Sequence, residues 1–92
     1  MANVIITFSI MPESPDVDLD SLTEEIKTDI KEFTGNEEMK TEMKPMAFGL
    51  KSLIVMFVMD EQKGTTDALE EKISRIEGIK SVEVTDVRRA IG

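Results

Sequence analysis

Apolar side chains recur with two different periods along this chain, and the order of the two periods is the strongest constraint on its fold. Residues 4–11 alternate, with Ile6, Phe8 and Ile10 on one side, as in a half-buried strand. Residues 19–33 carry apolar side chains at spacings of three and four, the pattern of an amphipathic helix. The remaining expected elements are strands at residues 38–46, 50–59 and 79–87 and a helix at 64–76. The predicted order is therefore βαββαβ.

Two strand–helix–strand units with right-handed crossovers combine into a ferredoxin-like sandwich, which is an α+β fold. We expect one four-stranded antiparallel sheet with the strand order 4-1-3-2 and both helices on one face. The first and third strands are the most apolar and suit the centre, whereas the second and fourth carry charges and suit the edges. The chain is too short for two independent cores, so residues 1–92 are expected to form a single domain.

Each expected helix has residues that can start and stop it. Asp18 can cap the first helix, and Gly35 can end it in the left-handed conformation. The second helix is expected to open near Asp67 and to close at Gly78. The expected core comprises apolar residues of the first strand and of both helix stripes: Ile6, Phe8, Ile10, Leu22, Ile26, Ile30, Leu69, Ile73 and Ile76.

Residues 44–51 join the polar second strand to the apolar third strand and are expected to form a hairpin tip. Gly49 gives the backbone access to positive φ, and Pro45 lacks the amide hydrogen that a strand ladder needs. Phe48, one of only four aromatic residues, then sits at the tip of the connection instead of inside a strand. The sequence leaves two possibilities open: Phe48 folds back onto the core, or it contacts a partner.

Composition excludes several kinds of function. The chain has no cysteine and no histidine, so it lacks thiolate ligands, thiol redox chemistry and the commonest neutral-pH general base. The longest apolar run, at residues 53–59, is far shorter than the roughly 20 residues of a membrane helix. Residues 1–4 have no cationic region of the kind that begins a signal peptide. We therefore expect a cytoplasmic protein without membrane contact or bound metal.

The net charge of −8 argues against nucleic acid as a direct partner, because phosphate binding relies on clustered Lys and Arg. Acidic side chains crowd residues 13–42 and 60–77, where they form either a solvated face or a surface that steers a basic protein. Two arginines, Arg88 and Arg89, stand against this trend at the end of the last strand. They either neutralise nearby acids such as Asp86 or act on a partner.

Several segments resemble motifs of known chemistry but lack residues that those motifs need. Residues 16–20 resemble the start of a calcium loop, but Ser21 and Lys27 stand where a glycine and a glutamate are needed. Residues 49–52 resemble the end of a phosphate loop without its upstream glycine. Copper chaperones of this topology need a Cys-x-x-Cys, and RNA-recognition domains need exposed strand aromatics and a basic surface. Nothing singles out two catalytic carboxylates among 19 acids, so we expect no enzyme and no cofactor.

Two segments of the sequence resemble one protein family. Residues 45–53, Pro-Met-Ala-Phe-Gly-Leu-Lys-Ser-Leu, are similar to the Pro-x-Gly-Phe-Gly-Ile-Lys-Lys-Leu segment of the elongation factor 1-beta family. Residues 60–71 are similar to the acidic stretch that follows it in that family. The likeness covers essentially the whole chain and is nearest to the short archaeal form. Ala47 and Ser52 depart from the pattern, since the family has a glycine and a lysine there.

The resemblance implies a guanine nucleotide exchange factor that promotes GDP release from elongation factor 1-alpha during translation, without chemistry of its own and monomeric when free. The terminal basic residue of the family is a lysine, and its counterpart here is a planar guanidinium. The residues that the resemblance and their positions assign to partner contact are Pro45, Phe48, Gly49, Lys51, Arg88 and Arg89. The alternative is a ferredoxin-like regulatory module that binds a small ligand and dimerises through its sheet edges.

The expected topology separates the candidate residues into two groups. The second strand runs parallel to the first and the fourth runs antiparallel to it, so Phe48 and the two arginines lie at opposite ends of the sheet. Strands of about nine residues span roughly 30 Å. This separation predicts a clamp across two parts of one partner. The resemblance implies that one end touches the GTP-binding domain near the magnesium ion and the phosphates, and that the other grips a neighbouring domain.

Overall fold

The structure, a computed structural model, describes residues 3–89 and contains four strands and two helices in the expected βαββαβ order. The strands are β1 (Asn3–Pro12), β2 (Met39–Pro45), β3 (Lys51–Asp60) and β4 (Ile79–Arg89), and the helices are α1 (Leu19–Thr34) and α2 (Asp67–Ser74). Two short 3₁₀ turns, η1 (Ala47–Gly49) and η2 (Glu61–Lys63), flank β3. The strands begin and end within two residues of the expected bounds.

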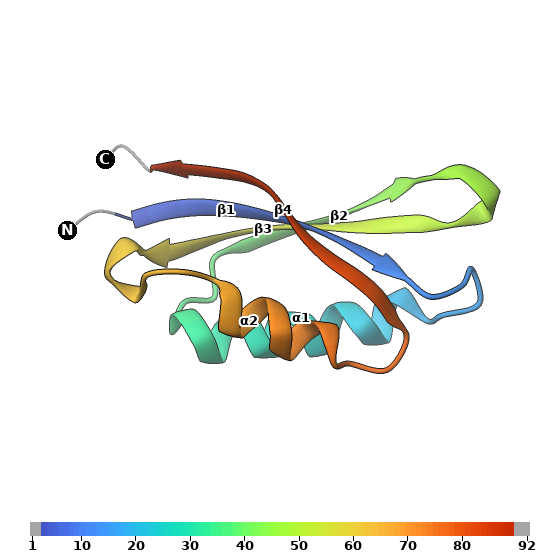
Figure 1. Ribbon diagram of the computed structural model, residues 1–92, viewed down its shortest axis with the longest axis horizontal. Coiled ribbons are helices and arrows are strands. Elements are labelled where there is room, and N and C mark those ends of the chain that lie inside the picture. Colours follow the sequence, from blue (N-terminus) through green and yellow to red (C-terminus); the bar gives the residue numbers. More distant parts are fainter. Residues whose placement is uncertain (1–2, 90–92) are drawn as a thin grey trace.

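The four strands form one antiparallel sheet in the order β2-β3-β1-β4, which is the predicted order 4-1-3-2 counted from the other edge (Figure 1). The central pair, β1 and β3, aligns Phe8 with Val55. β4 pairs with β1 through an irregularity that leaves Thr85 as an extra residue, since Thr7 pairs with Asp86 and Phe8 with Val84. Antiparallel pairing of β2 with β3 confirms the ferredoxin-like fold.

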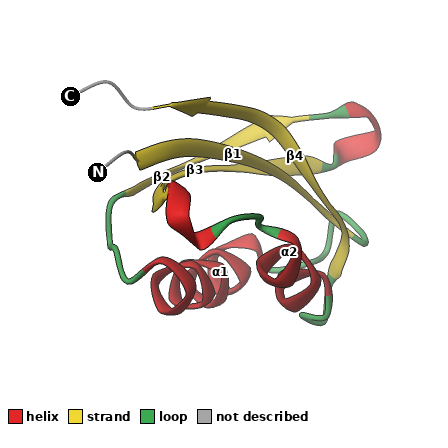
Figure 2. Cartoon of the chain, turned by 60° about the vertical axis from the view of Figure 1, so that its left-hand side comes forward, coloured by secondary structure: helices red, strands yellow, loops and turns green. Residues whose placement is uncertain are grey.

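Both helices cover one face of the sheet and leave the other face free (Figure 2). The layer between sheet and helices is apolar, and Phe8 and Phe57 meet edge to face with ring centroids 5.0 Å apart. These two rings are core residues, which agrees with the rejection of an RNA-recognition surface. The buried core residues are Ile6, Phe8, Ile10, Leu22, Ile26, Ile30, Leu53, Val55, Phe57, Met59, Leu69, Ile73 and Ile79.

The prediction that Ile76 is fully buried is wrong, although the other residues of the expected core are buried. α2 ends at Ser74, so Ile76 lies in the following turn, where its N–H donates to the Ile73 carbonyl at 3.0 Å. There the side chain is half-buried beside the outer surface of α1. The chain turns into β4 through Gly78, which has a φ of 98° and at which an added Cβ would lie only 3.2 Å from Val17 Cγ1.

The predicted ends of α1 are confirmed. The Asp18 carboxylate accepts hydrogen bonds from the backbone N–H groups of Asp20 and Ser21, at 3.1 and 3.4 Å, and from the Ser21 hydroxyl at 2.9 Å. These bonds, the Ser21 hydroxyl first, lower the pKa of Asp18 below its ordinary value of 3.8. Gly35 has a φ of 71° and donates its N–H to the Lys31 carbonyl at 2.7 Å, which ends the helix.

The molecule is elongated, with principal extents of 42, 21 and 19 Å. The β2–β3 hairpin projects past the helices at one end, and the carboxyl end of β4 lies beside the start of β1 at the other (Figure 1). The candidate residues at the hairpin and at the end of β4 therefore occupy opposite ends, as the topology predicts. None of the helices in the described part of the chain is long and apolar enough to cross a membrane.

Candidate partner-binding site

The β2–β3 hairpin carries Phe48 at its tip. Met46 donates its backbone N–H to the Leu50 carbonyl at 2.7 Å, and Leu50 donates its own N–H to the Ala47 carbonyl at 3.3 Å. These bonds close a short turn in which Phe48 is 93% exposed. The possibility that Phe48 folds back onto the core is therefore wrong, and the prediction that it is exposed is confirmed.

The backbone of this turn is left-handed at two successive residues. Phe48 has φ 62° and ψ 29°, and Gly49 has φ 75°. Among residues 3–89, Phe48 is the only residue other than glycine with a positive φ, a conformation that costs an L-residue about 1–2 kcal/mol. Ala47 has a negative φ. The departure from the family's glycine at Ala47 therefore introduces no backbone strain.

Two methionines of the hairpin end are also exposed. Met43 is 40% exposed and Met46 is 46% exposed. The sequence analysis did not include them among the candidate contact residues, because Met43 follows the core-side alternation of β2. The signal available in the sequence was the proximity of both methionines to the hairpin tip. Methionine side chains are flexible and polarisable, so they suit a contact surface that must adapt to a partner.

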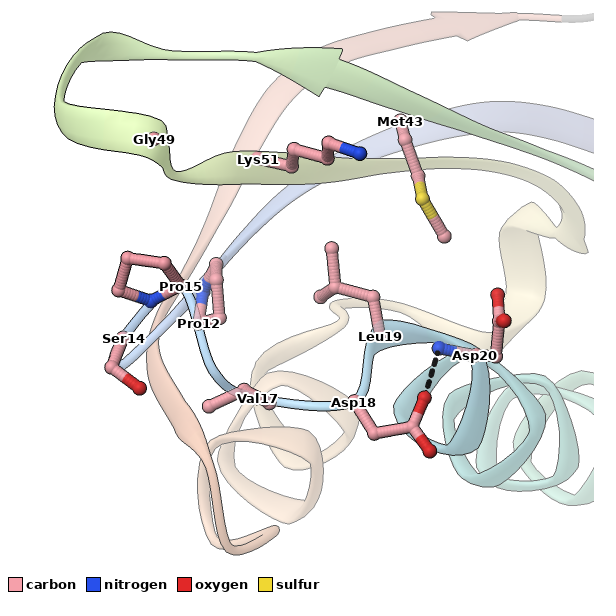
Figure 3. Close-up of a pocket in the computed structure, with 10 residues that line it drawn as sticks. All are labelled: Pro12, Ser14, Pro15, Val17, Asp18, Leu19, Asp20, Met43, Gly49 and Lys51. Carbon is pink, nitrogen blue, oxygen red and sulfur yellow. Dashed lines mark hydrogen bonds between the residues drawn. The ribbon is translucent and has the colours of Figure 1, made fainter.

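A shallow cleft of about 260 Å³ lies beneath the hairpin, between it and the loop from β1 to α1 (Figure 3). Lys51 and Met43 line its upper side, and Pro12, Pro15 and Leu19 line its lower side. Lys51 therefore faces the helix side of the sheet, whereas Phe48 projects from the tip. Within residues 3–89, no group of three or more acidic side chains is arranged to hold a metal ion.

The hairpin end brings together four of the candidate residues. Pro45 is the last residue of β2 and pairs with Lys51 in the register of the two strands. Phe48 and Gly49 form the turn that follows. Because Pro45 lies at the outer edge of the sheet, its missing N–H interrupts no interior ladder.

The carboxyl end of β4 carries Arg88 and Arg89, and both are paired with acids. The Arg88 Nε lies 2.8 Å from Asp86 Oδ2, and the Arg89 Nη2 lies 2.9 Å from Glu61 Oε2. Asp86 was named as a possible partner from the sequence, but Glu61 was not, because it approaches only through the fold.

These ion pairs leave the guanidinium groups accessible. The side chains of Arg88 and Arg89 are 77% and 71% exposed, and an exposed pair contributes only about 0–1 kcal/mol. The two arginines also point to opposite faces of the sheet, as successive strand residues must. Arg88 pairs with Ile5 on the helix-free face, whereas Arg89 pairs with Val4 on the helix side, where η2 supplies Glu61.

The comparisons with known proteins agree with this architecture. The family model described as the EF-1 guanine nucleotide exchange domain matches residues 5–90. The chain is 51% identical to elongation factor 1-beta of Methanothermobacter thermautotrophicus over 89 residues, which are 97% of this chain and 98% of that protein. It is 41% identical to elongation factor 1-beta of Sulfolobus acidocaldarius over 88 residues, 95% of this chain and 96% of that protein.

A guanine nucleotide exchange domain is thus the class that the fold and the family match define. The chain belongs to the EF-1 guanine nucleotide exchange domain family, whose similar members in archaea are named elongation factor 1-beta. The prediction of an exchange factor for elongation factor 1-alpha in protein synthesis is confirmed at the level of the family. The alternative, a regulatory module that binds a small ligand, is not favoured.

Proposed function

We propose that this exchange factor binds elongation factor 1-alpha with both ends of its sheet. The end that carries Arg88 and Arg89, the cationic end, promotes GDP release. The hairpin end, with Pro45, Phe48, Gly49 and Lys51, supplies most of the affinity. Arg88 or Arg89 acts on the nucleotide site. Affinity for GDP falls as affinity for the exchange factor rises, because the two ligands are linked through the same partner.

One observation supports this division of roles: an aromatic side chain that is 93% exposed lies at one end of a continuous sheet, and two accessible guanidinium groups lie at the other. A buried aromatic anchor typically contributes about 2 kcal/mol or more to an interface. The 42 Å length of the molecule suits contact with two separated parts of one partner better than contact with a single pocket.

The cationic end would act by electrostatics alone. A guanidinium brought near the phosphates of GDP competes with Mg²⁺ for the same negative oxygens. Mg²⁺ is one of the main contacts that retain the nucleotide, so its loss would accelerate the release of GDP. No covalent step is required, so the chain needs neither a catalytic residue nor a cofactor of its own.

The free protein would be a monomer in the cytoplasm, where translation takes place. The net charge of −8 disfavours direct contact with nucleic acid and leaves the acidic helix layer to face solvent or a basic surface of the partner. Gel filtration tests the first point, since a dimer that persists at low concentration contradicts it.

The decisive test is the release of fluorescent GDP from purified elongation factor 1-alpha, followed with and without this protein. We expect a faster release that saturates with the concentration of the exchange factor. Chelation of Mg²⁺ should raise the spontaneous rate and reduce the factor by which the protein accelerates it, because the assisted step has already occurred. Equal acceleration with and without Mg²⁺ would contradict the proposed role of the cationic end.

A further inference from the structure

We infer that Gly49 is a positioning residue that fixes the direction in which the Phe48 side chain leaves the backbone before the partner binds. The inference rests on the proposed function, because it assumes that Phe48 is the anchor of the hairpin end. It assigns to Gly49 a role that acts through the backbone and not through contact with the partner.

The surroundings of Phe48 show that its own turn sets the direction in which the side chain leaves the backbone. A residue that is 93% exposed receives almost no support from the packing of other side chains. The direction of its Cα–Cβ bond is therefore set by the turn, in which Phe48 has φ 62° and Gly49 has φ 75°. The hydrogen bond from Met46 to Leu50, at 2.7 Å, closes the strands behind the turn but does not involve either residue.

The requirement for glycine at position 49 is conformational and not steric. A Cβ added to Gly49 would meet no atom within 4 Å, so a methyl group fits there. Its φ of 75° nevertheless lies in the left-handed region, which L-residues adopt at a cost. Phe48 already bears that cost, and an L-residue at position 49 would add a second one in the same exposed turn.

The added cost would be relieved by a change in the turn. An exposed tip can rearrange without opening the sheet, because β2 and β3 remain paired up to Pro45 and Lys51. The conformer that presents Phe48 would then be only partly populated. The apparent affinity for the partner would fall in proportion to the population of that conformer. The maximal rate of GDP release would be unchanged, because it depends on the other end of the sheet.

The test compares L-alanine with D-alanine at position 49 in the full-length chain prepared by chemical synthesis. D-alanine favours positive φ, so it suits the left-handed backbone of Gly49, whose φ is 75°. We expect Gly49→Ala with the L-residue to raise the half-saturating concentration for GDP release about 5- to 10-fold. The D-alanine variant should match the glycine protein or bind more tightly, and both variants should keep the maximal rate.

Gly35 offers a matched control, because it has a φ of 71°, no atom within 4 Å of an added Cβ, and a place at the end of α1 away from the hairpin. L-alanine there should lower thermal stability without changing the half-saturating concentration, and D-alanine should restore the stability. Equal effects of L- and D-alanine at position 49, or no effect of either, would overturn the role of Gly49. Failure of the glycine protein itself to accelerate GDP release would instead overturn the proposed function.

Discussion

The two ends of the sheet differ in what holds their exposed side chains. At the hairpin, Phe48 is held by the backbone of its own turn and has no partner side chain. At the end of β4, Arg88 and Arg89 lie on a regular strand, and exposed acids hold their charged groups. The hairpin therefore presents an apolar ring on a Cα–Cβ bond whose direction the turn sets, whereas the end of β4 presents charge that can exchange partners.

This difference fits the proposed roles of the two ends, binding at the hairpin and nucleotide release at the end of β4. A phenylalanine side chain has only two rotatable bonds, so it loses little conformational entropy on binding and its burial contributes to affinity. A guanidinium in an exposed ion pair gives up about 0–1 kcal/mol when it leaves its acid for a phosphate. The aromatic ring can therefore stay bound during the whole exchange reaction, whereas the guanidinium acts only when the phosphates of GDP are close.

The largest expected effect comes from removing both cations from the end of β4. In the double variant Arg88→Ala, Arg89→Ala the maximal rate of GDP release should fall to the spontaneous rate, because no cation then competes with Mg²⁺. Binding through the hairpin should survive in weakened form, which titration calorimetry can measure. Deletion of residues 88–92 should have the same effect.

Arg75 provides the control for this variant. It is an exposed arginine paired with Glu71 on α2, remote from the end of β4. Arg75→Ala should leave the maximal rate unchanged. If the double variant still accelerates release as well as the intact chain at saturation, Arg88 and Arg89 are bystanders.

The second effect separates affinity from stability at the hairpin end. Phe48→Ala should cost about 2 kcal/mol of binding free energy, or roughly a 30-fold rise in half-saturating concentration. Its melting temperature should stay nearly unchanged, because the ring packs on nothing in the free protein. Phe57→Ala, which removes a core ring, should instead lower the free energy of unfolding by about 3–5 kcal/mol.

Calorimetry and thermal melting of the two variants check this contrast. A large loss of thermal stability in Phe48→Ala would mean that the ring packs on the core in solution. Unchanged binding of the same variant would show that the hairpin is not the anchor.

The sequence predicted the features of both ends that depend on local residues. Its periodicity gave the strands, and Pro45 and Gly49 gave the turn that exposes Phe48. It did not predict the positive φ of Phe48, because a bulky L-residue rarely adopts that conformation and no local pattern marks it. Nor did it predict the pairing of Arg89 with Glu61, since η2 reaches the end of β4 only through the pairing of β1 with both neighbours.

A smaller effect would distinguish the two arginines. Glu61→Gln frees Arg89, and Asp86→Asn frees Arg88, each from one exposed ion pair. Freeing the arginine that acts on the phosphates should tighten binding by up to about fivefold, since that pair no longer has to be broken. Freeing the other should have no effect. If Glu61→Gln alone tightens binding, the active cation lies on the helix side of the sheet. No effect of either variant would show that neither ion pair competes with the partner, and equal tightening by both would contradict a role for only one of the two arginines.

The smallest effect concerns a carboxylate at each end of α1. Asp18 lies at the hairpin end, and hydrogen bonds from Ser21 and Asp20 lower its pKa. Glu37 lies past the other end, and a hydrogen bond from Lys31 together with the charge of Lys31 lowers its pKa. A carboxylate whose pKa is lower in the folded than in the unfolded state stabilises the protein when ionised. That stabilisation is fully present above the unfolded value, which is 3.8 for Asp18, and is lost as the pH falls through the lowered folded value.

Asp18→Asn isolates the contribution of the charge, because asparagine caps a helix about as well as aspartate. The unfolding midpoint in urea should therefore be lower for Asp18→Asn than for the original protein at pH 7, and the difference should shrink as the pH falls below 3.8. Glu37→Gln, the matched change beyond the other end of α1, should show a difference that shrinks in the same direction below the ordinary value of 4.5. Neither variant alters Phe48, Arg88 or Arg89, so both should keep the half-saturating concentration and the maximal rate of GDP release at neutral pH. A difference in midpoint that does not change between pH 7 and the acid range would mean that Asp18 caps α1 without any contribution from its charge.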